Sequence, residues 1–214
     1  MADNVAALVR LMLVTDDGLV HGRDLVALAL AAERGGVTSV QVRLKQAEGR
    51  ELAQVVHRLM QVLTVPVLVN DRPDVAIATG AAGVHLGPDD LPVELARRIA
   101  PRGFIIGASV GSEAEAGKAG AADYWGIGPW RATKTKGDAG EGLGPEGFGK
   151  LRRLAGSKPC IAIGGVTPDE VMDVLSADGQ GVGVVSGILG AKDVEAAARA
   201  YIEAGQRGSG AAGQ

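Results

Sequence analysis

Two short acidic clusters each follow an apolar run, and their side chains suit a divalent metal. The first is Asn70-Asp71 and the second is Asp89-Asp90. Because the carboxyl ends of neighbouring parallel strands meet at one edge, we expect these side chains to gather there. Carboxylate oxygens favour Mg²⁺, which usually keeps several waters and bridges to substrate phosphates. The alternative is that Asp71 and Asp89 are turn or helix-capping residues.

A cationic cluster belongs to the predicted strand over residues 39–42 and its continuation. Gln41, Arg43 and Lys45 share one parity and alternate with apolar residues. Alternate side chains of a strand point to opposite faces, so the apolar set packs on helices and the polar set faces the interior. Since an unpaired buried charge is costly, the pattern predicts a bound anion beside Arg43 and Lys45.

Polar residues also follow a later strand and fill a long loop. Ser109 ends the fifth apolar run and offers a hydroxyl, although it could equally cap the next helix. Residues 133–136 read Thr-Lys-Thr-Lys within an irregular stretch, residues 128–145. Loops of this length in a compact domain are usually functional or disordered.

Glycine and serine follow the last two predicted strands. Gly164-Gly165 comes after the seventh and Ser186-Gly187 after the eighth. In α/β barrels these two loops commonly bind a phosphate through backbone N–H groups. The combination predicts a phosphate site.

Eight short apolar runs, each followed by a turn signal and a helical pattern, position these residues. The intervening segments 23–34, 49–63, 168–175 and 194–204 have the composition of amphipathic helices. Eight alternations in 214 residues predict a single α/β domain, a (β/α)₈ TIM barrel. An open doubly wound sheet is the alternative, because periodicity cannot show closure. The runs cover residues 11–14, 39–42, 67–69, 83–86, 104–108, 124–127, 160–163 and 181–185.

Composition narrows the class of protein. The catalytic domain is predicted over residues 1–204, and the Gly-, Ala- and Ser-rich segment 205–214 is predicted to be a disordered tail. A net charge of −3 offers no basic surface for nucleic acid, and we find neither a membrane span nor a signal peptide. We therefore expect a cytoplasmic protein that acts on small molecules. The sequence does not determine its oligomeric state, and a homo-oligomer is one possibility. Cys160, inside an apolar run, is predicted to be a core residue.

Four motifs keep a fixed order along the chain, and each lies at or just after the end of a predicted strand. They are Val-Asn-Asp-Arg-Pro-Asp-Val-Ala at 69–76, Gly-Val-His-Leu-Gly-Pro-Asp-Asp-Leu at 83–91, Gly-Ile-Gly-Pro at 126–129 leading to Thr-Lys-Thr-Lys at 133–136, and Ala-Ile-Gly-Gly at 162–165.

Together these motifs closely resemble the thiamine phosphate synthase family, over residues 11 to about 204. The resemblance implies a barrel that joins 4-amino-2-methyl-5-hydroxymethylpyrimidine diphosphate to a thiazole phosphate, giving thiamine phosphate and pyrophosphate with Mg²⁺. It implies a dissociative displacement, in which pyrophosphate leaves first and the thiazole nitrogen captures a pyrimidine cation.

The resemblance also implies a role for each matching residue. Asp71 and Asp90 correspond to the Mg²⁺ ligands, and Gln41 faces the pyrimidine. Arg43, Ser109 and Lys136 are the implied catalytic residues. The implied diphosphate contacts are Arg43, Lys45, Asn70, Ser109 and Lys136, and the implied thiazole phosphate contacts are Thr133, Thr135, Gly165, Val185 and Ser186.

The chain departs from the family pattern at two places. The family usually reads Arg-Glu-Lys where residues 43–45 read Arg-Leu-Lys. By strand parity Leu44 faces the helices, so we expect altered packing and no lost ligand contact. The family's loop commonly reads Pro-Ile-Phe-Pro-Thr where residues 129–133 read Pro-Trp-Arg-Ala-Thr. The pyrimidine end of the site is therefore expected to differ in shape.

Two other functions fit the same scaffold. A thiazole tautomerase would use a histidine two residues after the serine of the fifth strand, and this chain has Gly111 there. A non-catalytic regulator would keep the phosphate site without needing both Asp71 and Asp90. Both observations favour the synthase.

Overall fold

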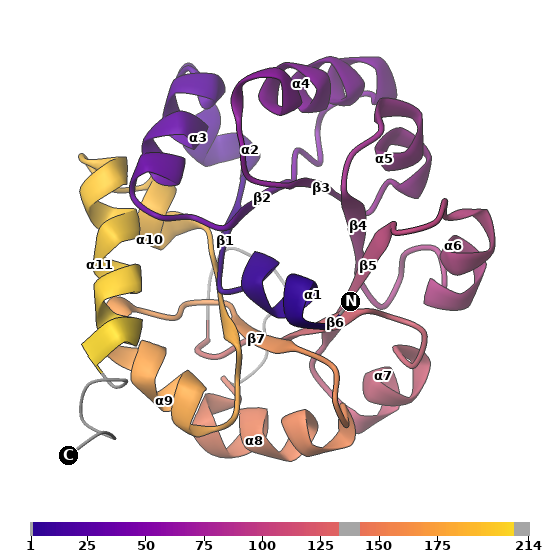
Figure 1. Ribbon diagram of the computed structural model, residues 1–214, viewed down its shortest axis with the longest axis vertical. Helices are drawn as coiled ribbons and strands as arrows, with labels where there is room; N and C mark the ends of the chain where they lie inside the picture. Colours follow the sequence, from indigo (N-terminus) through magenta and orange to yellow (C-terminus); the bar gives the residue numbers. More distant parts are fainter. Residues whose placement is uncertain (1, 133–141, 208–214) are drawn as a thin grey trace.

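The computed structural model describes residues 2–132 and 142–207. Eight parallel strands form a closed barrel in chain order, β1 to β8, surrounded by helices (Figure 1). Pairing of β8 with β1 closes the barrel, which confirms the predicted (β/α)₈ architecture and excludes the open sheet. The strands are β1 Leu11–Val14, β2 Ser39–Val42, β3 Val67–Asn70, β4 Gly83–Leu86, β5 Ile105–Val110, β6 Tyr124–Ile127, β7 Cys160–Ile163 and β8 Gly181–Val184.

Helices cover the outside of the barrel, except the first, which precedes β1 and lies across the ring (Figure 1). The described ones, each given as the structure has it, are α1 Ala2–Leu8, α2 Asp17–Val20, α3 Leu25–Arg34, α4 Gly49–Val62, α5 Pro73–Thr79, α6 Val93–Ile99, α7 Glu113–Lys118, α8 Gly144–Leu154, the 3₁₀ turn η1 Pro168–Glu170, α9 Val171–Ser176, α10 Ser186–Leu189 and α11 Val194–Arg207.

Several predicted helix boundaries differ from those in the structure. The helix predicted over 23–34 begins only at Leu25, because the Asp24 carboxylate caps its first turn. The segment predicted over 168–175 divides into η1 and α9. Helix α8 begins at Gly144, inside the stretch expected to be irregular. Helix α11 continues to Arg207, past the predicted domain boundary at 204.

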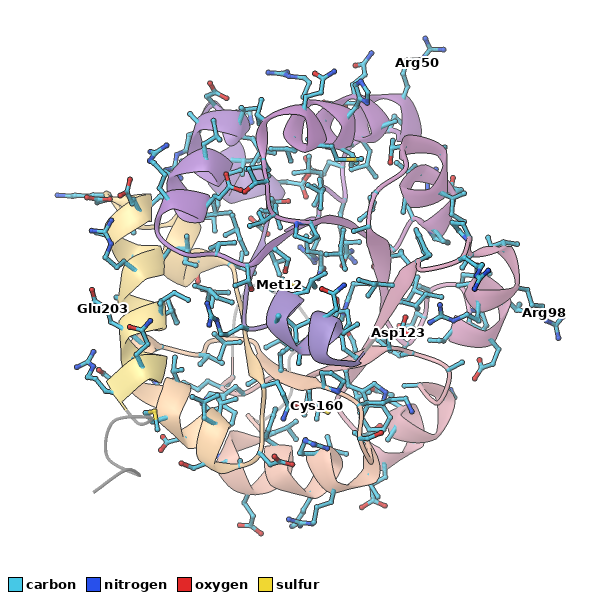
Figure 2. All side chains as sticks on the ribbon, viewed as in Figure 1. Met12, Arg50, Arg98, Asp123, Cys160 and Glu203 are labelled. Atoms are coloured by element: carbon cyan, nitrogen blue, oxygen red, sulfur yellow. The ribbon has the colours of Figure 1, made fainter. Side chains whose placement is uncertain are left out.

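Strand parity divides the core into two layers. Residues such as Leu13, Val40 and Val42 pack outward against the helices, whereas Met12 and Leu68 fill the barrel interior. Figure 2 shows Met12 inside the ring and Arg50, Arg98 and Glu203 extending outward. Cys160 is fully buried in the outer layer, where burial raises the pKa of its thiol to about 12. The prediction that Cys160 is a core residue is confirmed.

Helix α1, which the sequence patterns did not indicate, lies across the middle of the ring in Figure 1. Val5, Leu8 and Val9 join the interior layer with Met12. The Ser39 hydroxyl at the start of β2 donates to the Leu8 carbonyl at 2.8 Å, which places α1 at the amino ends of the strands. The interior is thus covered by α1 at the amino ends of the strands. Among the described residues, no helix is long and apolar enough to cross a membrane.

We expect Leu8→Ala to lower the free energy of unfolding by about 2–4 kcal/mol, because it opens a cavity at the covered end of the barrel. Urea denaturation provides the measurement. Leu154→Ala is the matched control, since the side chain of Leu154 is 54% exposed and its loss should change stability by less than about 0.5 kcal/mol. Equal effects of the two substitutions would contradict a structural role for α1.

Candidate active site

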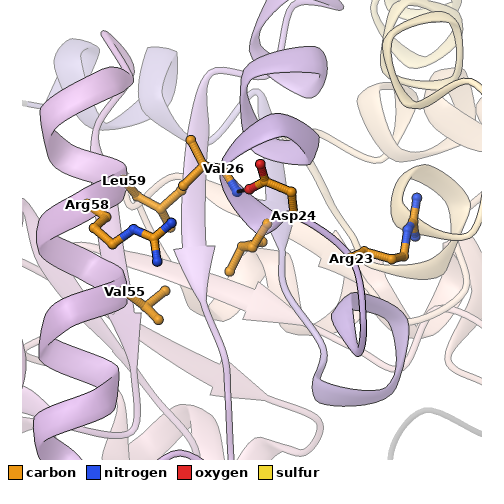
Figure 3. Close-up of a pocket in the computed structure, with 7 residues that line it drawn as sticks. Arg23, Asp24, Val26, Val55, Arg58 and Leu59 are labelled. Carbon is orange, nitrogen blue, oxygen red and sulfur yellow. Dashed lines mark hydrogen bonds between the residues drawn. The ribbon is translucent and has the colours of Figure 1, made fainter.

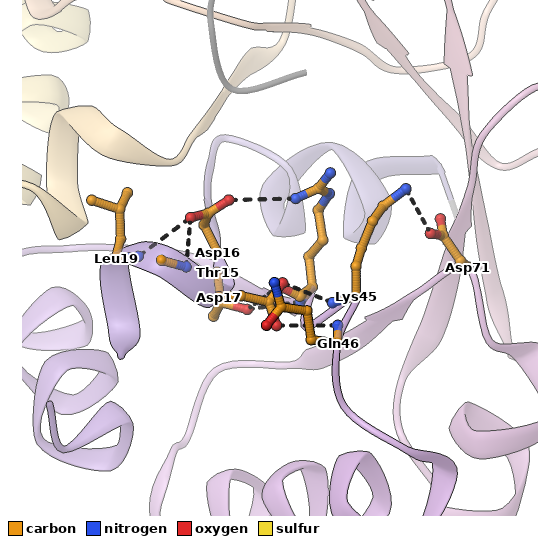
Figure 4. Close-up of polar contacts among 9 residues, drawn as sticks. Thr15, Asp16, Asp17, Leu19, Lys45, Gln46 and Asp71 are labelled. Atoms are coloured by element: carbon orange, nitrogen blue, oxygen red, sulfur yellow. Dashed lines mark hydrogen bonds and ion pairs between the residues drawn. The ribbon is translucent and has the colours of Figure 1, made fainter. Parts of the chain in front are cut away.

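Carboxylates and cations alternate along the carboxyl ends of β1, β2 and β3 (Figure 4). Arg43 Nη1 lies 3.5 Å from Asp16 Oδ2, and Lys45 Nζ lies 3.5 Å from Asp71 Oδ2. The Arg43 side chain is only 14% exposed, whereas that of Lys45 is 57% exposed. The structure therefore brings Arg43 and Lys45 to one rim, and each has a carboxylate partner there.

The two acidic clusters meet at this rim, as their spacing predicted. Asp71 donates its backbone N–H to the His85 carbonyl at 2.9 Å and has a φ of 64°, which few residues other than glycine adopt. Asp90 Oδ2 accepts the Gly87 N–H at 2.6 Å. Burial raises the pKa of Asp90, and so do its hydrogen bond to Asp71 and the charge of that residue. Two carboxylates crowded in this way favour a bound cation.

The alternative of turn or helix-capping residues is wrong as to capping for both aspartates, but it is confirmed for Asp89 as a turn residue. The residues at the N-cap positions of α5 and α6 are Arg72 and Pro92. Asp71 contacts Lys45, and Asp89 is exposed. Within the described ranges, 2–132 and 142–207, no group of three or more metal-binding side chains occurs, so the candidate cation site consists of the pair Asp71 and Asp90.

A polar cluster lies inside the barrel beside these charges. Ser109 belongs to β5, and its hydroxyl oxygen is 3.0 Å from His85 Nε2. His85 Nδ1 is 2.9 Å from the Tyr124 hydroxyl. Gln41, also buried, has its Nε2 3.2 Å from Met12 Sδ. The cap of α7 is Ser112, so the capping alternative for Ser109 is wrong.

The sequence analysis singled out neither His85 nor Tyr124 as a site residue. The alternation of side chains along β4 could have identified His85, because Val84 and Leu86 pack outward and His85 must then face the interior. A Cβ at Gly107 would stand 2.2 Å from Tyr124 Cζ, so only glycine leaves room for this ring.

The glycine pair after β7 adopts the expected unusual backbone. Gly164 and Gly165 have φ angles of 86° and 80°, which favour glycine. Across the β7–β8 pair, Val185 precedes α10 and Ser186 is its first residue, with an exposed side chain. These four residues lie at the same end of the barrel as Arg43 and Asp71, as their predicted role in phosphate binding requires.

The remaining predicted residues have less structural detail. Asn70 is the last residue of β3 and is half-buried beside Asp71. Thr133, Thr135 and Lys136 lie outside the described residues.

A surface hollow of about 310 Å³ lies elsewhere, between α3 and α4 (Figure 3). Its lining includes Arg23, Asp24 and Arg58 and contains none of the predicted site residues. The candidate active site is formed by the charged and polar residues at the carboxyl ends of the strands. This outer hollow is not part of it.

Comparisons with known proteins agree on one family. Residues 11–188 match the model of a family described as thiamine monophosphate synthase. The chain belongs to the thiamine monophosphate synthase family. It is 47% identical over 194 residues to the thiamine-phosphate synthase of Methanoculleus marisnigri, covering 88% of this chain and 92% of that protein. The corresponding protein of Azorhizobium caulinodans is 46% identical, with 88% and 91% covered.

A solved structure agrees with this assignment. The thiamine phosphate pyrophosphorylase from Pyrococcus furiosus superimposes with a TM-score of 0.84 at 35% identity, covering 95% of this chain and 98% of that one. Phosphoribosyl anthranilate isomerase from Thermotoga maritima, at 19% identity and a TM-score of 0.67, shares the fold alone. The chain is therefore an enzyme, a transferase of thiamine biosynthesis.

The first departure from the family pattern has the predicted structural consequence. Leu44 is half-buried and packs against the outer core layer, so strand parity placed it correctly. Its neighbours Arg43 and Lys45 still reach the rim.

The second departure lies beside the glycine pair. Trp130 Nε1 and Arg131 Nε donate to Glu170 Oε1 at 2.9 and 2.7 Å. The backbone N–H and hydroxyl of Thr167 both donate to Glu170 Oε2 at 2.9 Å. Although burial raises the pKa of Glu170, these four hydrogen bonds lower it overall. Glu170, which sequence reasoning missed, thus joins the start of the loop after β6 to the loop after β7.

We expect Glu170→Gln to lower the free energy of unfolding at pH 7 by about 1–3 kcal/mol, because an amide nitrogen cannot accept the Thr167 hydrogen bonds. The folded-state pKa of Glu170 is lowered, so its contribution is complete above about pH 4.3, the ordinary pKa of glutamate, and is lost as the pH falls through the folded-state value.

Urea denaturation of both proteins from pH 7 downward tests this expectation. The difference between them should shrink in acid, and a difference that stayed constant with pH would contradict it. Glu146→Gln is the control, because its side chain is 86% exposed and should change stability little at any pH.

Proposed function

We propose that this enzyme condenses 4-amino-2-methyl-5-hydroxymethylpyrimidine diphosphate with 4-methyl-5-(2-hydroxyethyl)thiazole phosphate. The products are thiamine phosphate and pyrophosphate. The observation that carries the proposal is the arrangement of Arg43 and Lys45 beside the carboxylate pair of Asp71 and Asp90. Cations next to a carboxylate pair suit a diphosphate that binds with a divalent metal.

Asp71 and Asp90 would hold Mg²⁺. Mg²⁺ is usually bound through one or two carboxylates, and the raised pKa of Asp90 reflects burial and a second carboxyl group that a cation would offset. When bound, the metal supplies neutralisation of charge on the leaving pyrophosphate.

The protein's own cations would do the remaining work on the leaving group. The C–O bond to the diphosphate breaks and pyrophosphate departs with the electron pair, leaving a resonance-stabilised pyrimidine cation. Arg43, Lys45 and Lys136 stabilise the negative charge that grows on pyrophosphate, with Asn70 and Ser109 as hydrogen-bonding partners. The thiazole nitrogen then forms the C–N bond.

The two substrates would occupy adjoining parts of the barrel end at which the strands have their carboxyl ends. The pyrimidine faces Gln41 inside the barrel, near the hydroxyl of Ser109 that His85 contacts. The thiazole phosphate binds at the loops after β7 and β8, where positive φ angles expose the backbone of the glycine pair. The residues proposed for it are Thr133, Thr135, Gly165, Val185 and Ser186.

The structure adds an argument against a tautomerase. A Cβ at Gly111 would stand 2.9 Å from the Gly128 carbonyl oxygen, so a histidine at this position would require the backbone to shift. A non-catalytic regulator would not need the carboxylate pair that Asp71 and Asp90 form.

Mixing both substrates with Mg²⁺ and assaying thiamine phosphate tests the proposal directly. We expect Asp71→Asn and Asp90→Asn each to lower turnover roughly a hundredfold or more, since each removes a carboxylate from the proposed metal site. Asp89→Asn is the control, because Asp89 belongs to the same cluster but is exposed, and it should retain full activity. Full activity of Asp71→Asn and Asp90→Asn in the presence of a chelator would contradict the proposed metal site.

The two phosphate sites can be separated by kinetics. Arg43→Ala and Lys136→Ala should mainly lower kcat, because these cations stabilise the departing pyrophosphate more than the bound substrate. Ser186→Ala should chiefly raise the KM for thiazole phosphate. A Ser186→Ala enzyme impaired only toward the pyrimidine substrate would show that the two sites are wrongly allocated.

A further inference from the structure

We propose that Asp16, at the end of β1, is a positioning residue that orients the Arg43 guanidinium toward the diphosphate. The inference rests on the proposed function, in which Arg43 contacts that leaving group. No motif used to recognise the site includes Asp16. Its role follows from its own ion pair with Arg43 and from the hydrogen bonds by which residues 15–17 hold the chain after β2.

The Asp16 carboxylate is held in place by its two oxygens acting separately (Figure 4). Oδ1 accepts the N–H groups of Gly18 and Leu19 at 3.1 and 3.3 Å, which caps α2. Oδ2 lies 3.5 Å from Arg43 Nη1. The carboxylate cannot turn away from Arg43 without losing its contacts to the helix, so it presents a fixed negative charge.

The main chain of Arg43 is held by Thr15, the residue that follows β1 and precedes Asp16. The fully buried Thr15 hydroxyl accepts the Arg43 N–H at 2.7 Å and donates to the Arg43 carbonyl at 3.1 Å. Asp17 accepts the Lys45 N–H at 2.9 Å. Residues 15–17 thus hold the backbone of both cationic residues, and Asp16 adds control of the guanidinium.

The separation of Asp16 and Arg43 suits exchange with a ligand. At 3.5 Å it exceeds the roughly 2.7–2.9 Å of a charge-assisted hydrogen bond. The carboxylate therefore offsets the charge of Arg43, whose side chain is only 14% exposed, while the planar fork of N–H groups can still engage phosphate oxygens. Asp16 would keep Arg43 at the rim before the diphosphate arrives.

Asp16→Asn tests this idea, because the asparagine oxygen still accepts the two N–H groups of α2 but carries no charge. We expect binding of inorganic pyrophosphate with Mg²⁺, measured by calorimetry, to weaken about tenfold. The kcat/KM for the pyrimidine diphosphate should fall by a similar factor. The KM for thiazole phosphate should not change, which a general structural defect would not reproduce.

Asp24→Asn is the matched control. Asp24 caps α3 in the same way, accepting the N–H groups of Val26 and Ala27 at 3.0 and 3.3 Å, but it lines the outer hollow away from the rim. It should leave pyrophosphate binding unchanged. Tenfold weaker binding in this variant too would overturn the proposal, because it would show that cap chemistry alone affects the site.

A double-mutant cycle with Arg43→Ala identifies the residue through which Asp16 acts. In the Arg43→Ala background, Asp16→Asn should change pyrophosphate binding less than twofold, about the limit of additive behaviour. An undiminished effect would overturn the proposal. If Arg43→Ala weakens binding and Asp16→Asn does not, only the positioning role fails. If Arg43→Ala itself has no effect, the proposed role of Arg43 fails, and the positioning role with it.

Discussion

Pairing of opposite charges at the carboxyl ends of the strands is the interaction on which this site depends. A buried or half-buried charge is costly without a partner. Asp16 and Arg43 form one pair, and Lys45 and Asp71 form another, with Asp90 beside Asp71. The protein therefore holds its two cations at the rim by pairing each with a carboxylate, which is the arrangement that the proposed diphosphate and metal would use.

The closed barrel is what makes this pairing available. Parallel strands all end on one face, so residues that follow β1, β2 and β3 meet although they are far apart in the chain. Helix α1 covers the opposite end and fills it with apolar side chains. Between the two ends, Ser109, His85 and Tyr124 form a hydrogen-bonded polar cluster inside the barrel.

A second connection joins two neighbouring loops, those after β6 and β7. Glu170 accepts hydrogen bonds from Trp130 and Arg131 on one loop and from Thr167 on the next. Trp130 and Arg131 stand where the family pattern usually has other residues, and both donate to a carboxylate on the neighbouring loop. Loop sequence and barrel geometry are thus adjusted to each other locally.

The sequence by itself predicted the eight strands, favoured a barrel over an open sheet, and identified the rim residues Arg43, Lys45, Asp71 and Asp90, but not Asp16. Strand parity placed Arg43 inward and Leu44 outward, because side chains of a strand must alternate. Motif spacing placed Asp71 and Asp90 at one edge, and the roles of these residues in metal and substrate binding stay predictions.

Only the tertiary structure decided which side chains are in contact at the site. The contacts of Asp16 with Arg43, of Glu170 with Trp130 and of His85 with Tyr124 join residues 27, 40 and 39 positions apart. No local pattern encodes such contacts, because they arise only when neighbouring strands pair and their ends and loops come together in space.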